Sequence, residues 1–382
     1  MKKRILVVLL IATMIAGLVA CGPSDAGTGD TPASQGAEAS AQPAESGGDG
    51  EAAVPADGDG IKIGVSFATL QEERWQTDLG IMEAKAKELG VEIVSQSANG
   101  DENLQISQAE NMITQGIDVL VVIAQNGAAA APIVESAHNA GIPVIAYDRL
   151  ITDCDLDFYI TFDCTKVGEI QAQYAIEHAP KGNYFLIGGS PTDNNAHLIR
   201  NGQMNILQPY IDSGDIKVVV DQWATGWNPE EALKYVEDGL SANNNDVACV
   251  LTSNDGCAGA AIQALSEQGL AGDVVVTGLD ADLAACQRIV EGTQSMTVYR
   301  RFAIVDNMTV EAAVAMAKGE DLSTLFDTTT VENGQKDVLS VLMTSEEDMF
   351  PLTKDNMNVA IEDGWLPKEE IYKNIPEGEW PE

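Results

Sequence analysis

The chain has 382 residues, 45% of them hydrophobic, and carries a formal net charge of −38. A chain of this length can bury a substantial core and has room for two domains. A body this acidic repels nucleic acids and anionic lipid surfaces, which excludes DNA and RNA as partners and favours a solvated acidic surface.

Residues 1–21 have the order of a targeting segment. Three basic residues at positions 2–4 precede an apolar stretch, residues 5–20, that is short for a membrane span and ends at Cys21. This order resembles the bacterial lipoprotein signal, and the resemblance implies that Cys21 is lipidated and becomes the mature N-terminus. Residues 22–60 hold eight acids, no Lys or Arg and almost no large apolar residue, so we expect a disordered acidic tether.

From residue 61 the chain alternates between short apolar segments, typical of buried strands, and segments with helical spacing. The strands of a first series are predicted at residues 61–67, 91–94, 119–123, 142–147 and 158–162. The helices between them are predicted at residues 75–89, 103–115 and 129–139. This alternation predicts a parallel sheet covered by helices on both faces.

A second series of the same kind follows. Its strands are predicted at residues 183–187, 216–220, 247–251, 274–277 and 295–298. Its helices are predicted at residues 165–177, 195–210, 229–240, 256–268 and 281–291. The two series predict an α/β fold with two doubly wound parallel-sheet lobes.

The C-terminal part supplies one more helix, residues 302–318, and one more strand, residues 338–343. We infer that the chain crosses back to the first lobe near Tyr299 and returns to the second near Thr330. Two lobes joined by three crossings make a hinge. The expected lobes are residues 61–164 plus 300–330 and residues 165–299 plus 331–382.

The strand ends carry the polar residues of interest, because ligands of open α/β sheets bind outside the carboxyl ends of the strands. The strand at residues 142–147 ends in Asp148 and Arg149, and the same pattern recurs after other strands. Singly, Asn254 could be an ordinary loop residue, Asp280 a helix N-cap and Trp227 a core residue. Together, planar carboxylate, amide and guanidinium groups pair with neighbouring hydroxyls, and tryptophan stacks on an apolar ring face. The combination predicts a saccharide site.

Several long stretches carry a family resemblance: residues 73–76, 96–100, 146–149, 188–196, 221–223, 253–255, 264–272, 280–284 and 296–299. Over residues 61–365 the chain resembles the D-xylose-binding proteins of the type I class of ABC-transporter solute-binding proteins. The resemblance implies sugar ligands at Arg74, Trp75, Asp148, Arg149, Asp193, Asn195, Trp227, Asn254 and Asp280. Arg300 stands where the family has a lysine, and Ala68-Thr69 stands where a close relative has an acidic pair.

The resemblance implies a monomeric receptor without cofactor, and the N-terminal signal implies that it is lipid-anchored on the outer face of the cytoplasmic membrane. It would close around a monosaccharide, D-xylose, and deliver it to the permease of an ABC importer. Another pentose or hexose, such as glucose, galactose or arabinose, is the alternative ligand, and a sugar-sensing system is an alternative partner. A sugar-responsive repressor is rejected because it needs a basic helix-turn-helix at the N-terminus.

An enzyme is disfavoured because G-x-G-x-x-G is missing after the first strand and no histidine lies with a nucleophile. Spacing alone leaves a paired-carboxylate glycosidase open. Beyond Cys21, five cysteines remain, without CxxC spacing, so a metal site is not expected. Cys154 and Cys164 flank a strand too long for them to form a disulfide, and the sequence leaves one bridge elsewhere open.

Overall fold

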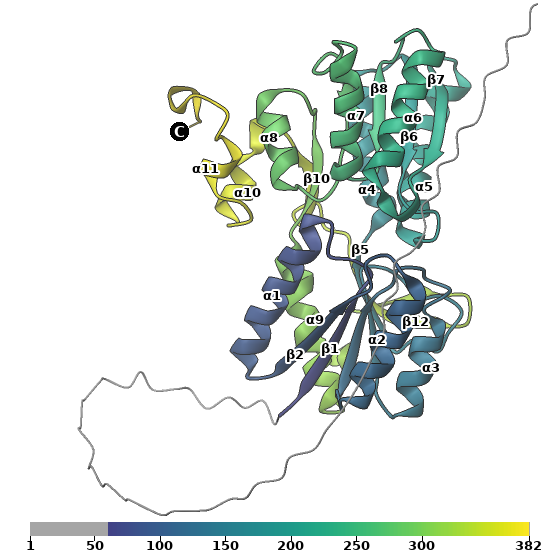
Figure 1. Ribbon diagram of the computed structural model, residues 1–382, viewed down its shortest axis with the longest axis vertical. Helices are drawn as coiled ribbons and strands as arrows, with labels where there is room; N and C mark the ends of the chain where they lie inside the picture. The colour runs from purple at the N-terminus through teal and green to yellow at the C-terminus, as the bar shows by residue number, and fades with distance from the viewer. Residues whose placement is uncertain (1–59, 382) are drawn as a thin grey trace, which may run out of the picture. The chain divides into compact units, whose positions relative to one another are not determined.

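The computed structural model describes residues 60–381. The expected signal, the lipidated Cys21 and the tether lie outside these residues. The folded part contains two lobes, each with a twisted, largely parallel sheet between helices, so the predicted α/β fold class is confirmed (Figure 1). Within residues 60–381 no helix combines the length and the apolar character that a membrane crossing requires.

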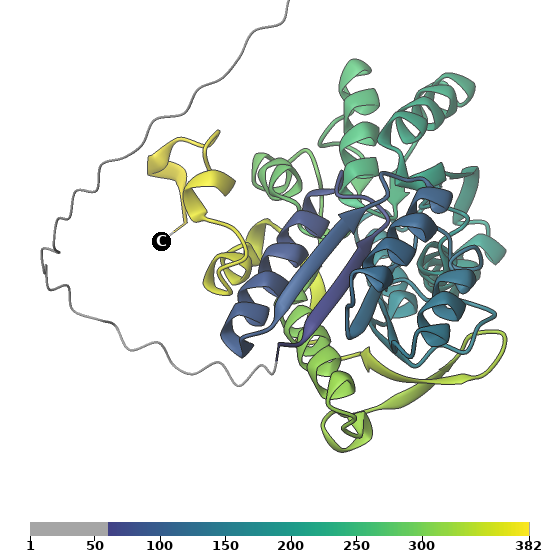
Figure 2. The ribbon, with the colours of Figure 1, turned by 60° about the horizontal axis from the view of Figure 1, so that its bottom comes forward.

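The sheet of the first lobe has the strand order β11-β12-β5-β4-β3-β1-β2. Its parallel strands are β1 (Lys62–Phe67), β2 (Glu92–Ser97), β3 (Val119–Ile123), β4 (Val144–Tyr147), β5 (Phe158–Phe162) and β12 (Asp337–Met343). The antiparallel edge strand β11 (Thr329–Glu332) forms a hairpin with β12. Helices α1 (Glu73–Leu89) and α9 (Phe302–Ala317) cover one face, and α2 (Glu102–Thr114) and α3 (Ala131–Asn139) cover the other (Figure 2).

The sheet of the second lobe has the order β7-β6-β8-β9. Its strands are β6 (Gly182–Gly188), β7 (Ile216–Trp223), β8 (Cys249–Thr252) and β9 (Val275–Val276). Helices α4 (Cys164–His178) and α5 (Asn194–Asp212) pack on one face, and α6 (Pro229–Ala242) and α7 (Asp255–Glu267) on the other. Strand β10 (Thr297–Arg300) pairs with β13 (Met349–Leu352), and α8 (Leu283–Glu291), α10 (Asn358–Glu362) and α11 (Lys368–Ile371) pack beside them.

The predicted lobe boundary after residue 330 is wrong. The strand predicted at residues 338–343 does not belong to the second lobe, because Ser340–Met343 pairs with Tyr159–Phe162 of β5 in the first sheet. The chain returns to the second lobe only between β12 and β13. An apolar alternating pattern predicts a strand but does not say which sheet the strand joins.

One helix begins later than its apolar spacing predicts. The helix expected at residues 281–291 starts at Leu283, because Asp280 and Ala281 have positive φ angles of 103° and 54°. Positive φ is rare for residues other than glycine, and it cannot be read from periodicity. These two residues turn the chain at the carboxyl end of the second sheet.

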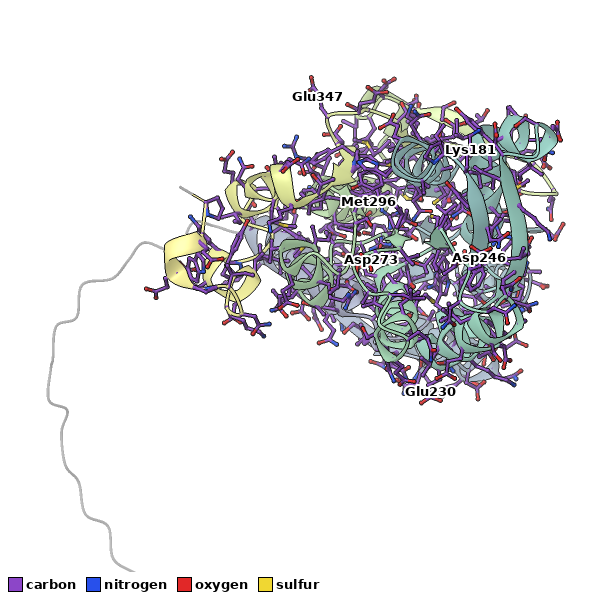
Figure 3. The ribbon with its side chains drawn as sticks, turned by 90° about the horizontal axis from the view of Figure 1, so that it is seen from above. Lys181, Glu230, Asp246, Asp273, Met296 and Glu347 are labelled. Carbon is purple, nitrogen blue, oxygen red and sulfur yellow. The ribbon has the colours of Figure 1, made fainter. Side chains whose placement is uncertain are left out.

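The described cysteines are all buried and free, so the disulfide that the sequence left open does not form among residues 60–381. The acidic charge lies mainly at the surface. Figure 3 labels Glu230, Asp246, Asp273 and Glu347, all of which are exposed. The charged residues discussed next are different, because they are buried.

Candidate sugar-binding site

The ten sequence-predicted site residues line a single cavity at the carboxyl ends of both sheets. They are Arg74, Trp75, Asp148, Arg149, Asp193, Asn195, Trp227, Asn254, Asp280 and Arg300. The cavity is completed by Glu72, Cys164, Ile199 and Leu279. Parallel strands align their carboxyl ends at one edge of a sheet, and this alignment is why residues distant in sequence meet here.

Local backbone structure in the second lobe sets the orientation of the polar side chains that line the cavity. Asp193 and Asn254 are the N-caps of α5 and α7, where their side chains accept from the backbone N–H groups of Asn195 and Cys257 at 2.9 and 3.0 Å. Trp227 and Asp280 have positive φ angles of 60° and 103°. Such conformations cost free energy and tend to occur at functional sites.

The first lobe contributes mainly cations. The guanidinium of Arg74, in the first turn of α1, lies over the rings of Trp75 and Phe302, at 4.2 and 4.3 Å from their centroids. Its Nη2 donates to Asp148 Oδ2 at 2.7 Å, and its Nε donates to Asp78 Oδ2 at 3.2 Å. These contacts fix the plane of the guanidinium, which is 4% exposed.

Charged pairs and hydrogen bonds join the two lobes across the cavity. Arg149 Nε lies 2.9 Å from Asp193 Oδ2, and Asn195 Nδ2 donates to Asp148 Oδ1 at 2.9 Å. Arg300, at the second crossing, donates to Asp280 Oδ1 at 3.0 Å and lies 3.4 Å from Asp148 Oδ2. Every predicted aspartate of the site therefore faces a guanidinium.

The two tryptophans of the site each donate to an acid. Trp75 Nε1 donates to Glu72 Oε2 at 2.6 Å, and Trp227 Nε1 donates to Asp193 Oδ2 at 3.1 Å. The Trp227 ring also lies against Gly189, where a Cβ would come within 2.3 Å of ring carbons. A glycine is therefore required for this approach, and both indole rings are held in fixed orientations.

Burial and the neighbouring arginines act in opposite directions on the pKa values of the buried acids. Burial raises the pKa of Asp148, but the guanidiniums of Arg74 and Arg300 outweigh burial and bring the pKa below its usual value. For Asp193 burial is stronger than the attraction of Arg149, and the pKa is raised. Burial also raises the pKa of Glu72.

The cavity is small because these side chains contact one another. The free volume among them is about 20 Å³, which is enough for the centre of a single water molecule. A wider cavity of about 670 Å³ adjoins it and shares Glu72, Trp227, Asn254 and Asp280 with it. A ring-sized ligand therefore needs the polar pairs between the lobes to separate first.

Glu72 is the charged residue among the four lining residues that sequence reasoning missed. It precedes the recognised run Glu73-Arg74-Trp75, bonds the Trp75 indole and lies 3.6 Å from Arg149 Nη2. Its neighbour Glu73 is exposed on α1 and does not line the inner cavity. The only sequence signal was its position at the end of the loop after β1, a position that both acids share.

The lining of the cavity combines hydrogen-bonding groups with aromatic rings. It offers carboxylate and amide acceptors, guanidinium and amide donors, and two indole rings. No histidine lines the cavity, and the only thiol there, Cys164, is buried with a pKa raised above its ordinary value. An unactivated thiol is a poor nucleophile.

A model of the periplasmic binding protein domain matches residues 63–321. The chain belongs to the periplasmic binding protein family. Among its relatives, the D-xylose-binding periplasmic protein of Escherichia coli is 50% identical over 312 residues, covering 81% of this chain and 92% of the relative. The D-xylose-binding periplasmic protein of Haemophilus influenzae is 49% identical, covering 82% and 92%.

One solved structure among the similar proteins has the same fold. It is a carbohydrate transporter solute-binding protein from Chloroflexus aurantiacus in complex with D-glucose. It superposes with a TM-score of 0.74 at 30% identity, covering 82% of this chain and 98% of the other.

Proposed function

We propose that this chain is an extracytoplasmic receptor that binds a monosaccharide, most specifically D-xylose, and delivers it to an ABC importer. The observation that carries the proposal is the single cavity in which both lobes supply hydrogen-bonding groups in matched pairs. The sugar exchanges these protein–protein pairs for protein–hydroxyl bonds when the lobes close around it. The two D-xylose-binding relatives, each about half identical, favour the pentose.

The proposal includes a way in for the ligand. The inner cavity cannot hold a pyranose as it stands, and the wider cavity shares four lining residues with it. The lobes are joined by three short segments, between β5 and α4, β10 and α9, and β12 and β13. Such a connection permits hinge opening, and bound sugar then favours the closed state because polar groups of both lobes pair with it.

The remaining parts of the proposal concern the oligomeric state, the absence of catalysis and the attachment to the membrane. The chain acts as a monomeric binding protein rather than an enzyme, and the lipid on Cys21 holds it at the outer face of the membrane. The order of basic, apolar and small residues before Cys21 supports the anchor. Membrane fractionation of the Cys21→Ser variant tests it, and a variant that stays with the membrane would contradict it.

The ligand is tested by titration calorimetry and thermal shift with D-xylose, D-glucose, L-arabinose and D-ribose. A ligand that binds only the folded state stabilises it by about 2.7 kcal/mol at a concentration of 100 Kd. We expect xylose to bind most tightly, because a sugar that inverts a paired hydroxyl leaves a buried partner unsatisfied at about 1–3 kcal/mol. Release of a cleaved product during incubation would contradict the receptor and favour a glycosidase.

Glucose is the second candidate. It has the ring hydroxyls of xylose and one added hydroxymethyl group, and the Chloroflexus aurantiacus relative is complexed with D-glucose. Rejection of an added group by a pocket wall is weaker than rejection of a missing hydrogen bond. Tighter binding of glucose than xylose would assign the chain to the second candidate.

A further inference from the structure

Three buried polar groups lie behind the cavity and are not part of its lining. Asp78 on α1, Tyr147 at the end of β4 and Asp306 on α9 are each 0% exposed. Tyr147 Oη lies 3.0 Å from Asp78 Oδ2 and 2.6 Å from Asp306 Oδ1. One phenol oxygen therefore bridges two carboxyl groups inside the hydrophobic core.

Counting protons limits how this bridge forms. A phenol carries one hydrogen, so it donates to only one of the two carboxyl groups. The other contact requires that the carboxyl group itself carries a proton and donates to the phenol oxygen. Two carboxylates around one tyrosine would leave an acceptor facing an acceptor at 2.6 or 3.0 Å, depending on which of them the phenol donates to.

The neighbouring cation identifies the ionised group. Arg74 Nε donates to Asp78 Oδ2 at 3.2 Å, which favours the charged form of Asp78. Asp306 has no arginine or lysine partner among the described residues, whereas both carboxyl groups have one oxygen without a hydrogen-bond partner there, Asp78 Oδ1 and Asp306 Oδ2. An unpaired buried carboxylate is costly, so the proton belongs to Asp306.

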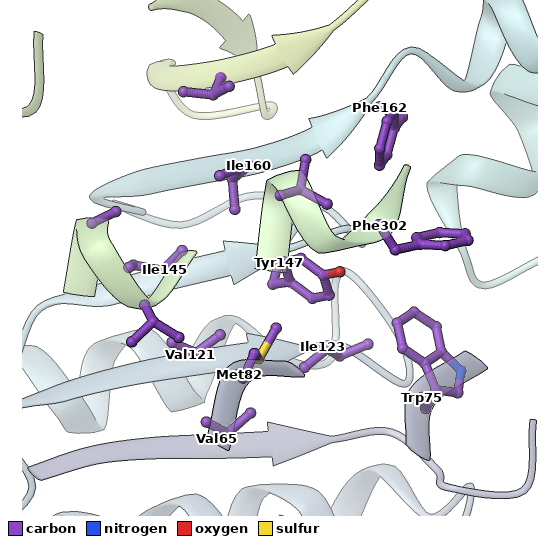
Figure 4. Packing of buried hydrophobic residues seen from close by; sticks show 14 of the residues in the cluster. Val65, Trp75, Met82, Val121, Ile123, Ile145, Tyr147, Ile160, Phe162 and Phe302 are labelled. Carbon is purple, nitrogen blue, oxygen red and sulfur yellow. The ribbon is translucent and has the colours of Figure 1, made fainter. Parts of the chain in front are cut away.

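The surroundings of Asp306 agree with this assignment. Figure 4 shows Tyr147 among Val121, Ile123 and Phe302, and β3 and β5 bring only apolar side chains to this cluster. The charged or titratable groups around it are those of α1, of the end of β4 and of the second crossing: Arg74, Asp78, Tyr147, Asp148 and Arg300. Burial raises the pKa of Asp306 well above its ordinary value and raises that of Asp78 to about 6.

We propose that Asp306 is a protonated acid at neutral pH that positions Arg74 for the sugar through a chain of hydrogen bonds. Asp306 donates to Tyr147, Tyr147 donates to Asp78, and the Asp78 carboxylate holds the guanidinium of Arg74. Asp306 lies in the second turn of α9, the helix that follows Arg300 at the crossing. This chain of hydrogen bonds thus links the hinge segment to a guanidinium that faces the sugar. The effect of Asp306 on sugar binding rests on the proposed function.

The protonation is tested without sugar by following thermal stability with pH in the wild type and in Asp306→Asn. A folded-state pKa raised above the unfolded one gives stability that is fully present below the unfolded pKa and lost as pH rises through the folded pKa. The asparagine side chain does not titrate, and its amide still donates a hydrogen bond to Tyr147. The melting temperature of the variant should therefore rise relative to wild type by about 5 °C between pH 4 and pH 8.

A difference that stays constant or falls with rising pH would mean that Asp306 is ionised in the folded protein, and would overturn the proposal. So would failure of the asparagine variant to fold at pH 7, because an amide supplies the same neutral donor in nearly the same volume.

The positioning role is tested by xylose titration at pH 7. The affinity of Asp306→Asn for xylose should lie within about twofold of wild type. Asp306→Leu and Tyr147→Phe interrupt the chain of hydrogen bonds and should bind xylose roughly tenfold more weakly, as expected for one lost hydrogen bond. Equal affinities for the asparagine and leucine variants would overturn the positioning role. If xylose bound to none of the proteins, including wild type, the proposed ligand would fail while the pH test still decided the protonation.

Discussion

The two lobes build their halves of the site by different means. The first lobe supplies Arg74 and Arg149, and the guanidinium of Arg74 donates to Asp78 and contacts the rings of Trp75 and Phe302. The second lobe supplies acids and amides oriented by backbone features, namely the helix caps at Asp193 and Asn254 and the positive φ at Asp280. Closure therefore brings cations of one lobe against anions of the other, with each half already oriented.

Asp148 is the exception, because it is an acid on the cationic side, and its removal should have the largest effect. It accepts from Arg74 at 2.7 Å and from Asn195 at 2.9 Å, with Arg300 at 3.4 Å. Breaking a buried charge pair costs about 3–5 kcal/mol. We expect Asp148→Asn to lower the free energy of unfolding by about 3 kcal/mol in urea titrations and xylose affinity by about 100-fold or more.

Asp155→Asn is the control for the loss of Asp148. It removes an ion pair with Lys336 of similar length, 2.6 Å, but at the surface. Exposed pairs contribute about 1 kcal/mol or less, and Asp155 does not line the cavity. Equal losses of stability and of xylose affinity in the two variants would show that the contribution of an ion pair here does not depend on its burial.

The next test separates charge from capping in the second lobe. Asp193→Asn keeps a good N-cap for α5 but presents an amide nitrogen to the Trp227 indole, which donates to Asp193, and to the Arg149 guanidinium, which forms an ion pair with Asp193. A hydrogen bond to a charged group is worth about 1.5–3 kcal/mol, so xylose affinity measured by calorimetry should fall about tenfold to 100-fold.

Asp163→Asn is the matched control, because it makes the same substitution at the N-cap of another helix. Asp163 caps α4 by accepting from Thr165 and Lys166 and lies outside the cavity lining. We expect its affinity to be unchanged, because asparagine and aspartate cap helices about equally well. If Asp193→Asn also bound xylose like wild type, the pair between Arg149 and Asp193 would have no role in recognition.

The sequence was sufficient for the residues at strand ends. Asp148, Asn254 and Asp280 follow short apolar runs, and parallel strands place such residues at a common edge. The sheet to which β12 belongs could not be predicted, because an alternating pattern carries no information on the partner strand. The positive φ of Asp280, which delays α8, is a tertiary effect without a local signal.

The groups behind the site were also beyond sequence reasoning. Tyr147 ends an apolar run that predicts only a buried strand, and Asp78 and Asp306 lie within helices, where an acid is normally expected to face solvent. Only the structure shows that α1 and α9 pack on the same face of the sheet and bring the two acids to one tyrosine.

The smallest effect on binding should come from a substitution at Gly189, which the Trp227 ring approaches closely. A methyl group at Gly189 would lie 2.3 Å from carbons of the Trp227 ring, so Gly189→Ala must move the indole and stretch its bond to Asp193. Overpacking costs about 1–3 kcal/mol, and part of it should appear as severalfold weaker binding in calorimetry. The same substitution at Gly80, exposed on α1 with no atom near the added carbon, should leave affinity unchanged and raise stability by about 0.5–1 kcal/mol. Wild-type affinity in Gly189→Ala would show that the second lobe tolerates a shifted indole, and that its caps and acids alone orient the sugar.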